Sequence, residues 1–283
     1  MSSMGKAQPG DPIGIFDSGV GGLSVLRAIR QQLPTESIIY FADQAHVPYG
    51  PLPLEEVRAF AEGITRFLLG QGAKLIVVAC NTASAAALHY LRKTFPDVPF
   101  VGMEPAVKPA AEHTRSGVVG VLATPATFQG ALYASVVERF ANGVTVLQDT
   151  CPGLVMQIEA GRTDSPEVRA ILEKALVPML AQGIDTVVLG CTHYPFVIPA
   201  IEAIAGPGVR VIDPAPAVAR QAGRLLEAGG LLNRGAQPGE VRYLTSSEPG
   251  PLEALLPALV GETGPVGRAV WDGLALQLVD CQM

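Results

Sequence analysis

The chain has 283 residues, 48% hydrophobic and 16% charged, so it can form a sizeable core and is not expected to be disordered. Its formal charge of −6 and its lack of a basic block argue against a nucleic-acid groove. No apolar run reaches the roughly 18–20 residues that span a membrane, and the polar start MSSMGKAQPGDP predicts a short disordered leader on a soluble cytoplasmic protein.

Short apolar runs alternate with helical patterns along the chain. Strands are predicted at 12–17, 37–43, 74–80, 98–103, 117–123, 143–149, 184–190, 208–213 and 240–246. Helices are predicted near 22–33, 54–70, 82–94, 126–141, 165–182 and 215–228. Strands that are apolar on both faces and separated by helices are typical of parallel sheets covered on both sides. The sequence therefore predicts an α/β protein with doubly wound parallel sheets.

The two halves of the chain contain similar segments in the same order. IGIFDS at 13–18 matches VGVLAT at 119–124, an offset of 106 residues. LIVVACNTAS at 75–84 and TVVLGCTHYP at 186–195 are both apolar runs that stop at a cysteine, and the two cysteines are 111 residues apart. The small difference between the offsets fits one loop insertion. The pattern predicts two similar lobes related by a pseudo-two-fold axis.

Lobe 1 is expected to be discontinuous and to hold residues 1–103 and 211–283, and lobe 2 is expected to hold residues 104–210. Open parallel sheets bind ligands outside the carboxyl ends of their strands. If those ends face each other, Cys80 and Cys191 lie on opposite walls of one cleft between the lobes. We expect the active site in that cleft.

Two facing thiols can move a proton from one face of a carbon atom to the other. One thiolate removes an α-proton and the opposite thiol returns a proton, provided that the surroundings adjust each thiol pKa. The simpler interpretation of an isolated cysteine after a strand is a small buried apolar residue, and this is what we expect of Cys151. Cys281 is expected to have no role. The cysteines contain no C-x-x-C pair, so no metal site is indicated.

Six segments together resemble glutamate racemases, a family of cofactor-independent enzymes that supply bacterial cell-wall precursors. They are GIFDSGVGGLSVL, FADQAHVPYG, VVACNTASA, GVLATPATFQGALY, CPGLVMQIEAG and VLGCTHYP. The resemblance runs from about residue 12 to 228, whereas 229–283 carries no recognised motif. It implies interconversion of L- and D-glutamate, which supplies D-glutamate for peptidoglycan synthesis, by a homodimer. No cofactor is expected, because none of the five lysines lies in these motifs, where a pyridoxal phosphate enzyme would need one.

The resemblance also implies roles for individual residues. Cys80 and Cys191 would be the two catalytic acid/bases, with Asp17, His193 and Glu159 assisting them. The segment before Glu159 departs from the family pattern, because it reads GLVMQIE where proline and valine are common. The substrate-binding positions would be Ser18, Pro48, Tyr49, Gly50, Asn81, Thr82, Thr124, Thr127 and Thr192.

Other functions compete with this interpretation. A Gly-rich turn after the first strand, with Asp43 ending the second, partly resembles a dinucleotide-binding fingerprint, but Ser24 occupies the third glycine position. Aspartate racemases share the two-cysteine architecture. A binding protein that has lost its chemistry is a third alternative, and the presence of both cysteines argues against it.

Overall fold

A computed structural model describes residues 7–141 and 143–279. Residues 1–6 of the expected leader, and Cys281, lie outside the described residues. The rest of the leader is not disordered, because its backbone is bonded to the body of the protein. The Lys74 ammonium donates to the Pro9 carbonyl, and the Lys74 N–H donates to the Pro12 carbonyl at 2.9 Å. Within the described ranges, none of the helices combines the length and apolarity needed to cross a membrane.

The larger sheet has seven strands in the order β11-β10-β9-β2-β1-β3-β4. Its strands are β1 (Ile13–Asp17), β2 (Ile38–Ala42), β3 (Leu75–Val78), β4 (Phe100–Gly102), β9 (Val241–Thr245), β10 (Val266–Asp272) and β11 (Ala275–Val279). Adjacent strands are parallel except β10 and β11, which form an antiparallel pair at the edge. The segment after residue 229 therefore extends this sheet.

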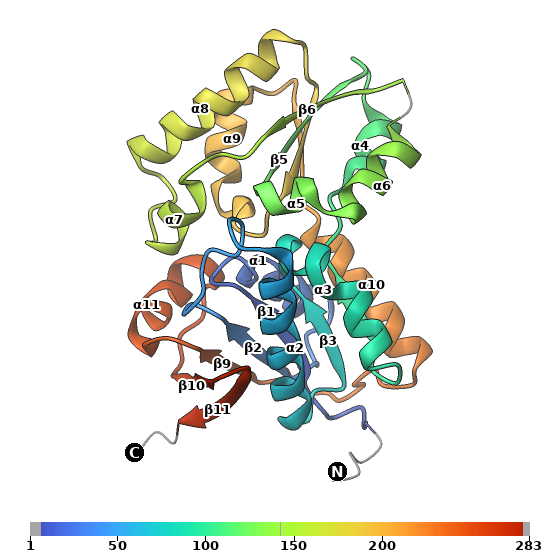
Figure 1. The fold of residues 1–283 in the computed structure, drawn as a ribbon, viewed down its shortest axis with the longest axis vertical. Coiled ribbons are helices and arrows are strands. Elements are labelled where there is room, and N and C mark those ends of the chain that lie inside the picture. The colour runs from blue at the N-terminus through green and yellow to red at the C-terminus, as the bar shows by residue number, and fades with distance from the viewer. Residues whose placement is uncertain (1–6, 142, 280–283) are drawn as a thin grey trace.

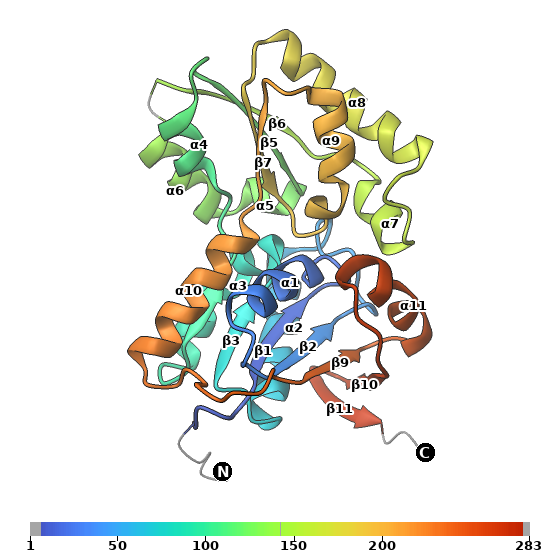
Figure 2. The same ribbon diagram turned by 180° about the vertical axis from the view of Figure 1, so that it is seen from behind.

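Helices cover both faces of the larger sheet (Figures 1 and 2). They are α1 (Leu23–Gln32), α2 (Leu54–Gly70), α3 (Asn81–Thr94), α10 (Ala215–Ala228) and α11 (Pro249–Val260). Successive side chains of a strand point to opposite faces, so Ile15 of β1 joins the core beneath α1 and Phe16 joins the core beneath α2 and α3. Both faces of β1 are apolar and buried, as expected for a central parallel strand.

The second sheet has four parallel strands in the order β6-β5-β7-β8. Its strands are β5 (Val118–Ala123), β6 (Thr145–Asp149), β7 (Thr186–Gly190) and β8 (Arg210–Ile212). Its helices are α4 (Val107–His113), α5 (Pro125–Gln129), α6 (Ala131–Phe140), α7 (Leu154–Glu159), α8 (Pro166–Ala181) and α9 (Ile198–Ala205), with a 3₁₀ turn at Tyr194–Val197. Figure 1 shows this lobe above the larger one, with α7 reaching toward α11.

The order of strands confirms the predicted two-lobe α/β fold. In the larger sheet β1 lies between β2 and β3 with β4 beyond, and in the smaller sheet β5 lies between β6 and β7 with β8 beyond. The domain limits themselves stay a prediction. β8 continues to Ile212, so the four-stranded sheet includes two residues that the predicted limits assign to lobe 1.

Two expectations about helices and strands differ from the structure. The helix predicted at 126–141 is two helices, because the backbone of Gly130 is extended (φ −68°, ψ 135°) and ends α5 before α6 begins. No helix or strand was predicted at the positions of α4, α7, α9, α11, β10 and β11.

Candidate active site

The carboxyl ends of four strands, two from each sheet, meet at one cavity. Ser18 follows β1, Cys80 closely follows β3, Thr124 follows β5 and Cys191 follows β7. The residues that line the cavity are Ser18, Pro48, Tyr49, Gly50, Cys80, Asn81, Thr82, Thr124, Val155, Cys191, Thr192 and His193. The two thiols thus reach a common cavity from separate sheets.

The cavity is small. The volume open to the centre of a water molecule is about 20 Å³, and one water needs roughly 10–15 Å³ on that measure. Cys80 and Cys191 are each 5% exposed. An amino acid therefore enters only if the walls of the cavity move apart.

Asp17 and Cys80 form the part of the site in the larger lobe. Asp17 is fully buried at the end of β1, and its Oδ2 accepts a hydrogen bond from the Gly22 N–H at 2.7 Å. Cys80 precedes α3, and its sulfur accepts from the Ala83 N–H at 3.5 Å. Burial raises the pKa of Asp17. Burial, and then the charge of Asp17, raise the pKa of the Cys80 thiol well above 9.0, which favours a proton-carrying sulfur in the closed site.

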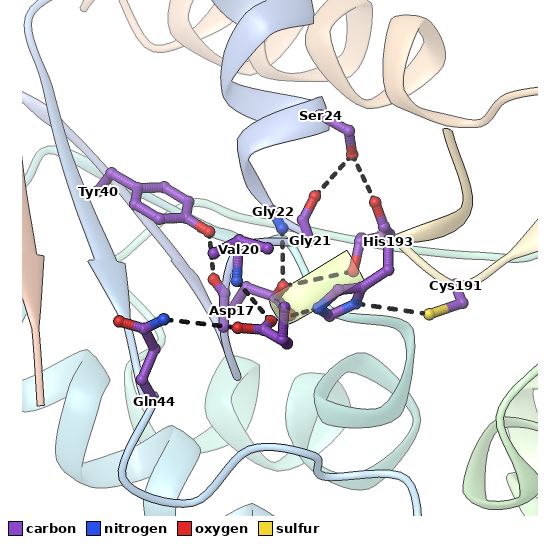
Figure 3. A network of polar contacts seen from close by, with 12 residues as sticks. Asp17, Val20, Gly21, Gly22, Ser24, Tyr40, Gln44, Cys191 and His193 are labelled. Carbon is purple, nitrogen blue, oxygen red and sulfur yellow. Dashed lines mark hydrogen bonds and ion pairs between the residues drawn. The ribbon is translucent and has the colours of Figure 1, made fainter. Parts of the chain in front are cut away.

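Cys191 and His193 (Figure 3), together with Glu159, form the part of the site in the smaller lobe. His193 Nδ1 lies 3.7 Å from the Cys191 sulfur, and His193 Nε2 lies 2.6 Å from Glu159 Oε1. Burial alone lowers the pKa of His193, but the hydrogen bonds to Cys191 and Glu159 outweigh it and place that pKa well above 6.5. Burial acts to raise the pKa of Glu159, and the contacts with His193 bring it below 4.5 instead. Both directions favour a pair of an imidazolium and a carboxylate.

The loop after β1 holds Glu159 and His193 in place. The Val20 N–H donates to Glu159 Oε1 at 2.8 Å. A Cβ atom on Gly19 would lie 1.9 Å from that oxygen, and one on Gly21 would lie 2.4 Å from His193 Nδ1. The glycines in GVGG thus let the backbone approach side chains of the same protein, so this turn is filled from within and does not fit a dinucleotide.

Three threonine hydroxyls connect the two lobes beside the cavity. Thr82 Oγ1 lies 2.9 Å from Thr124 Oγ1, which lies 2.9 Å from Thr127 Oγ1. Thr82 is in α3 of the larger lobe, whereas the other two are at the start of α5. Asn81 is 3% exposed, and neither Oδ1 nor Nδ2 of its side chain has a hydrogen-bond partner among the described residues. This amide is therefore available to a ligand.

The predicted site residues gather in one place. Asp17, Glu159 and Thr127 are not among the residues that line the cavity. Thr127 is hydrogen-bonded to Thr124, which does line it. Val155 lines the cavity but was missed, because an apolar residue in a helix gives no chemical signal. Asp43 was considered only as part of a dinucleotide fingerprint, and it is fully buried beside the cavity loop.

Known proteins share the sequence and the fold of this chain. A model of the Asp/Glu/hydantoin racemase family matches residues 13–222. The chain belongs to this family. A glutamate racemase from Pseudomonas aeruginosa is 54% identical over 258 residues, which cover 91% of this chain and 97% of that protein.

Solved structures of family members include complexes with both enantiomers of glutamate. Glutamate racemase from Francisella tularensis in complex with D-glutamate is 29% identical, with a TM-score of 0.80 over 93% of this chain and 98% of that one. Glutamate racemase from Escherichia coli in complex with L-glutamate and the activator UDP-MurNAc-ala is 32% identical, with a TM-score of 0.78 over 95% and 100%.

Proposed function

We propose that the chain interconverts L- and D-glutamate by a two-thiol mechanism that needs no cofactor. The observation that carries the proposal is that Cys80 and Cys191, which follow strands of separate sheets, line one cavity. Membership of the racemase family supports it, as do relatives named glutamate racemase. Related structures hold D-glutamate in one case and L-glutamate in another.

Polar groups around the cavity suit a substrate with two carboxylates. The positive end of a helix dipole favours an anion, and α3 begins at Asn81 in the cavity wall. The unpaired amide of Asn81 and the hydroxyls of Ser18, Thr82 and Thr192 add neutral donors. We infer that they bind the carboxylates and orient the α-carbon between the sulfurs.

Proton transfer would use the two thiols in opposite roles. For one enantiomer the Cys191 thiolate removes the α-proton, and the Cys80 thiol gives its proton to the opposite face of the carbanion. The reverse reaction starts from a Cys80 thiolate and a Cys191 thiol. Protonated His193 would donate a hydrogen bond to Cys191 when that sulfur is a thiolate. Asp17 would accept a hydrogen bond from Cys80 when that sulfur is a thiol. One proton leaves and one enters the substrate in each direction.

The α-proton is far less acidic than any side chain, so the carbanion needs stabilisation. Hydrogen bonds to the α-carboxylate that strengthen as negative charge develops lower the barrier. Pyridoxal phosphate would require a lysine, and within the described ranges no lysine lines the cavity. Removal of water from the closed site also strengthens these interactions.

The biological setting is part of the proposal. A racemase of this kind would supply D-glutamate for peptidoglycan synthesis in the cytoplasm, and we expect it to act as a homodimer. Its partners would be the two glutamate enantiomers, without nucleic acid or a membrane.

The test is racemisation of each enantiomer of glutamate and aspartate, followed by circular dichroism and chiral chromatography. We expect activity on glutamate only, without added cofactor, and loss of that activity in Cys80→Ala and Cys191→Ala. Wild-type rates in either variant would refute the two-thiol mechanism. Preference for aspartate would assign the chain to the other substrate of the family.

A further inference from the structure

A buried carboxylate outside the proposed mechanism connects the cavity to the end of the chain. Asp43 follows β2 and is fully buried. Its Oδ2 accepts from the Tyr49 hydroxyl at 2.5 Å and lies 2.9 Å from His46 Nδ1. Its Oδ1 accepts from the Ser246 hydroxyl at 2.7 Å and from the Trp271 indole N–H at 2.8 Å. Four side chains therefore converge on one carboxylate.

These four side chains come from two parts of the chain. Tyr49 belongs to the loop that lines the cavity together with Pro48 and Gly50. Ser246 follows β9 and Trp271 is in β10, so both belong to the segment after residue 229, which carries no recognised motif. Asp43 thus connects the cavity wall to the C-terminal strands.

Further contacts hold the same two parts together. The Ser246 hydroxyl also accepts from the Ala45 N–H at 2.9 Å, and the Thr245 hydroxyl donates to Gln44 Oε1 at 2.9 Å. The Trp271 ring lies 5.4 Å from the His46 ring. The first part of the loop that carries Tyr49, from Gln44 to His46, is therefore supported by the C-terminal segment.

The shape of the cavity depends on the position of the Tyr49 ring, because Tyr49 lines the cavity. Tyr49 is 1% exposed and its ring stacks on Phe60 of α2 at 6.0 Å, while Trp271 contacts the same Phe60 at 5.5 Å. Within the described residues, the one hydrogen bond recorded for the Tyr49 hydroxyl is to Asp43. A shift of the Asp43 carboxylate would therefore move Tyr49 in a cavity that has almost no spare volume.

We propose that Trp271 and Ser246 are positioning residues for substrate binding, which act through Asp43 on Tyr49. The inference rests on the proposed racemase function and extends it to the C-terminal segment. Neither residue lines the cavity. Their hydrogen bonds to Oδ1 fix the orientation of the carboxylate, so that Oδ2 holds the Tyr49 ring against the ligand.

The experiment compares Trp271→Phe and Ser246→Ala with the wild-type chain. Each removes one donor to Oδ1, and loss of a hydrogen bond to a buried charge should raise KM for both enantiomers about three- to tenfold, with a smaller change in kcat. Ser247→Ala is the matched control, because only the backbone of Ser247 has a hydrogen bond among the described residues. Thermal unfolding of each variant establishes that it is folded.

A double-mutant cycle separates positioning from general stabilisation. Tyr49→Phe removes the hydroxyl bonded to Oδ2, so adding Trp271→Phe to it should raise KM no further. Independent, multiplying effects would overturn the proposal, as would an unchanged KM in both single variants. If Trp271→Phe does not fold, the same cycle with Ser246→Ala decides. An inactive wild-type chain would refute the proposed function and this inference with it, whereas an active wild type with unaffected variants refutes the inference alone.

Discussion

Replacement of Glu159 by glutamine tests the contact between the two lobes at the active site. The Glu159 side chain is 7% exposed and bonds to His193 and to the Val20 N–H through the same oxygen. Hydrogen bonds to charged groups contribute about 1.5–3 kcal/mol, and a glutamine oxygen can still accept weakly. We therefore expect Glu159→Gln to lose about 2 kcal/mol of transition-state stabilisation, a roughly thirtyfold fall in kcat/KM.

The same variant changes the pH dependence in a defined direction. Glu159 helps to raise the pKa of His193 above 6.5, so the glutamine variant should lose its imidazolium at a lower pH. The basic limb of the kcat/KM profile therefore shifts to lower pH. Racemisation followed by circular dichroism, at several substrate concentrations for each pH, measures this kcat/KM profile. Glu173→Gln, on the exposed surface of α8, is the control. A rate and profile equal to those of the wild type would refute the assignment of Glu159.

The pKa directions also predict how this pair contributes to stability. His193 has a raised pKa in the folded state, so its contribution is complete below 6.5 and is lost as pH rises through the raised value. Glu159 has a lowered pKa, so its contribution is present above 4.5 and is lost as pH falls through the lowered value. The free energy of unfolding of Glu159→Gln, measured in urea, should therefore differ least from that of the wild type above the raised pKa of His193 and below the lowered pKa of Glu159.

Two further substitutions test the loop after β1 and the base of the larger lobe. Gly19→Ala would place its Cβ 1.9 Å from Glu159 Oε1 and so displace this carboxylate from His193 and from the Val20 N–H. We therefore expect a loss of thermal stability similar to that of Glu159→Gln and at least a roughly tenfold loss of kcat/KM; equal activity would contradict the close approach. Lys74→Met leaves Glu36 buried without its 2.6 Å ion-pair partner, both side chains being fully buried, and should cost about 3–5 kcal/mol in urea unfolding. Adding Glu36→Gln should restore part of that loss, and no recovery would contradict the charge argument.

The strands were predictable because their chemistry is local. Runs such as LIVV at Leu75–Val78 are rich in β-branched residues and apolar on both faces. All nine predicted strands are present near their predicted positions. The antiparallel pair β10 and β11 was not predicted, because its exposed residues, including Leu278 and Val279, do not form a clear alternation with polar ones. An edge strand has one solvated side, and its pattern is weaker.

The candidate site was predictable where a residue has chemistry of its own. The repeated strand-end cysteines indicated a shared cleft, and both now line one cavity. The contact between His193 and Glu159 was not predictable, because these residues are separated by 34 positions and meet only through the packing of α7. Asp43 was missed as a structural centre because its four partners are 3 to 228 residues away.

Hydrogen bonds across the boundary between the lobes have a kinetic consequence. The Ser24 hydroxyl donates to the Thr192 carbonyl at 2.9 Å, and the Thr82–Thr124 and Val20–Glu159 pairs cross the same boundary. At about 1 kcal/mol each, breaking all three would leave the open conformer at roughly 1% of molecules or below. Amino acids would then enter through this minority conformer, so the hydrogen bonds across the lobe boundary, and not only the groups that touch the ligand, set the rate of capture.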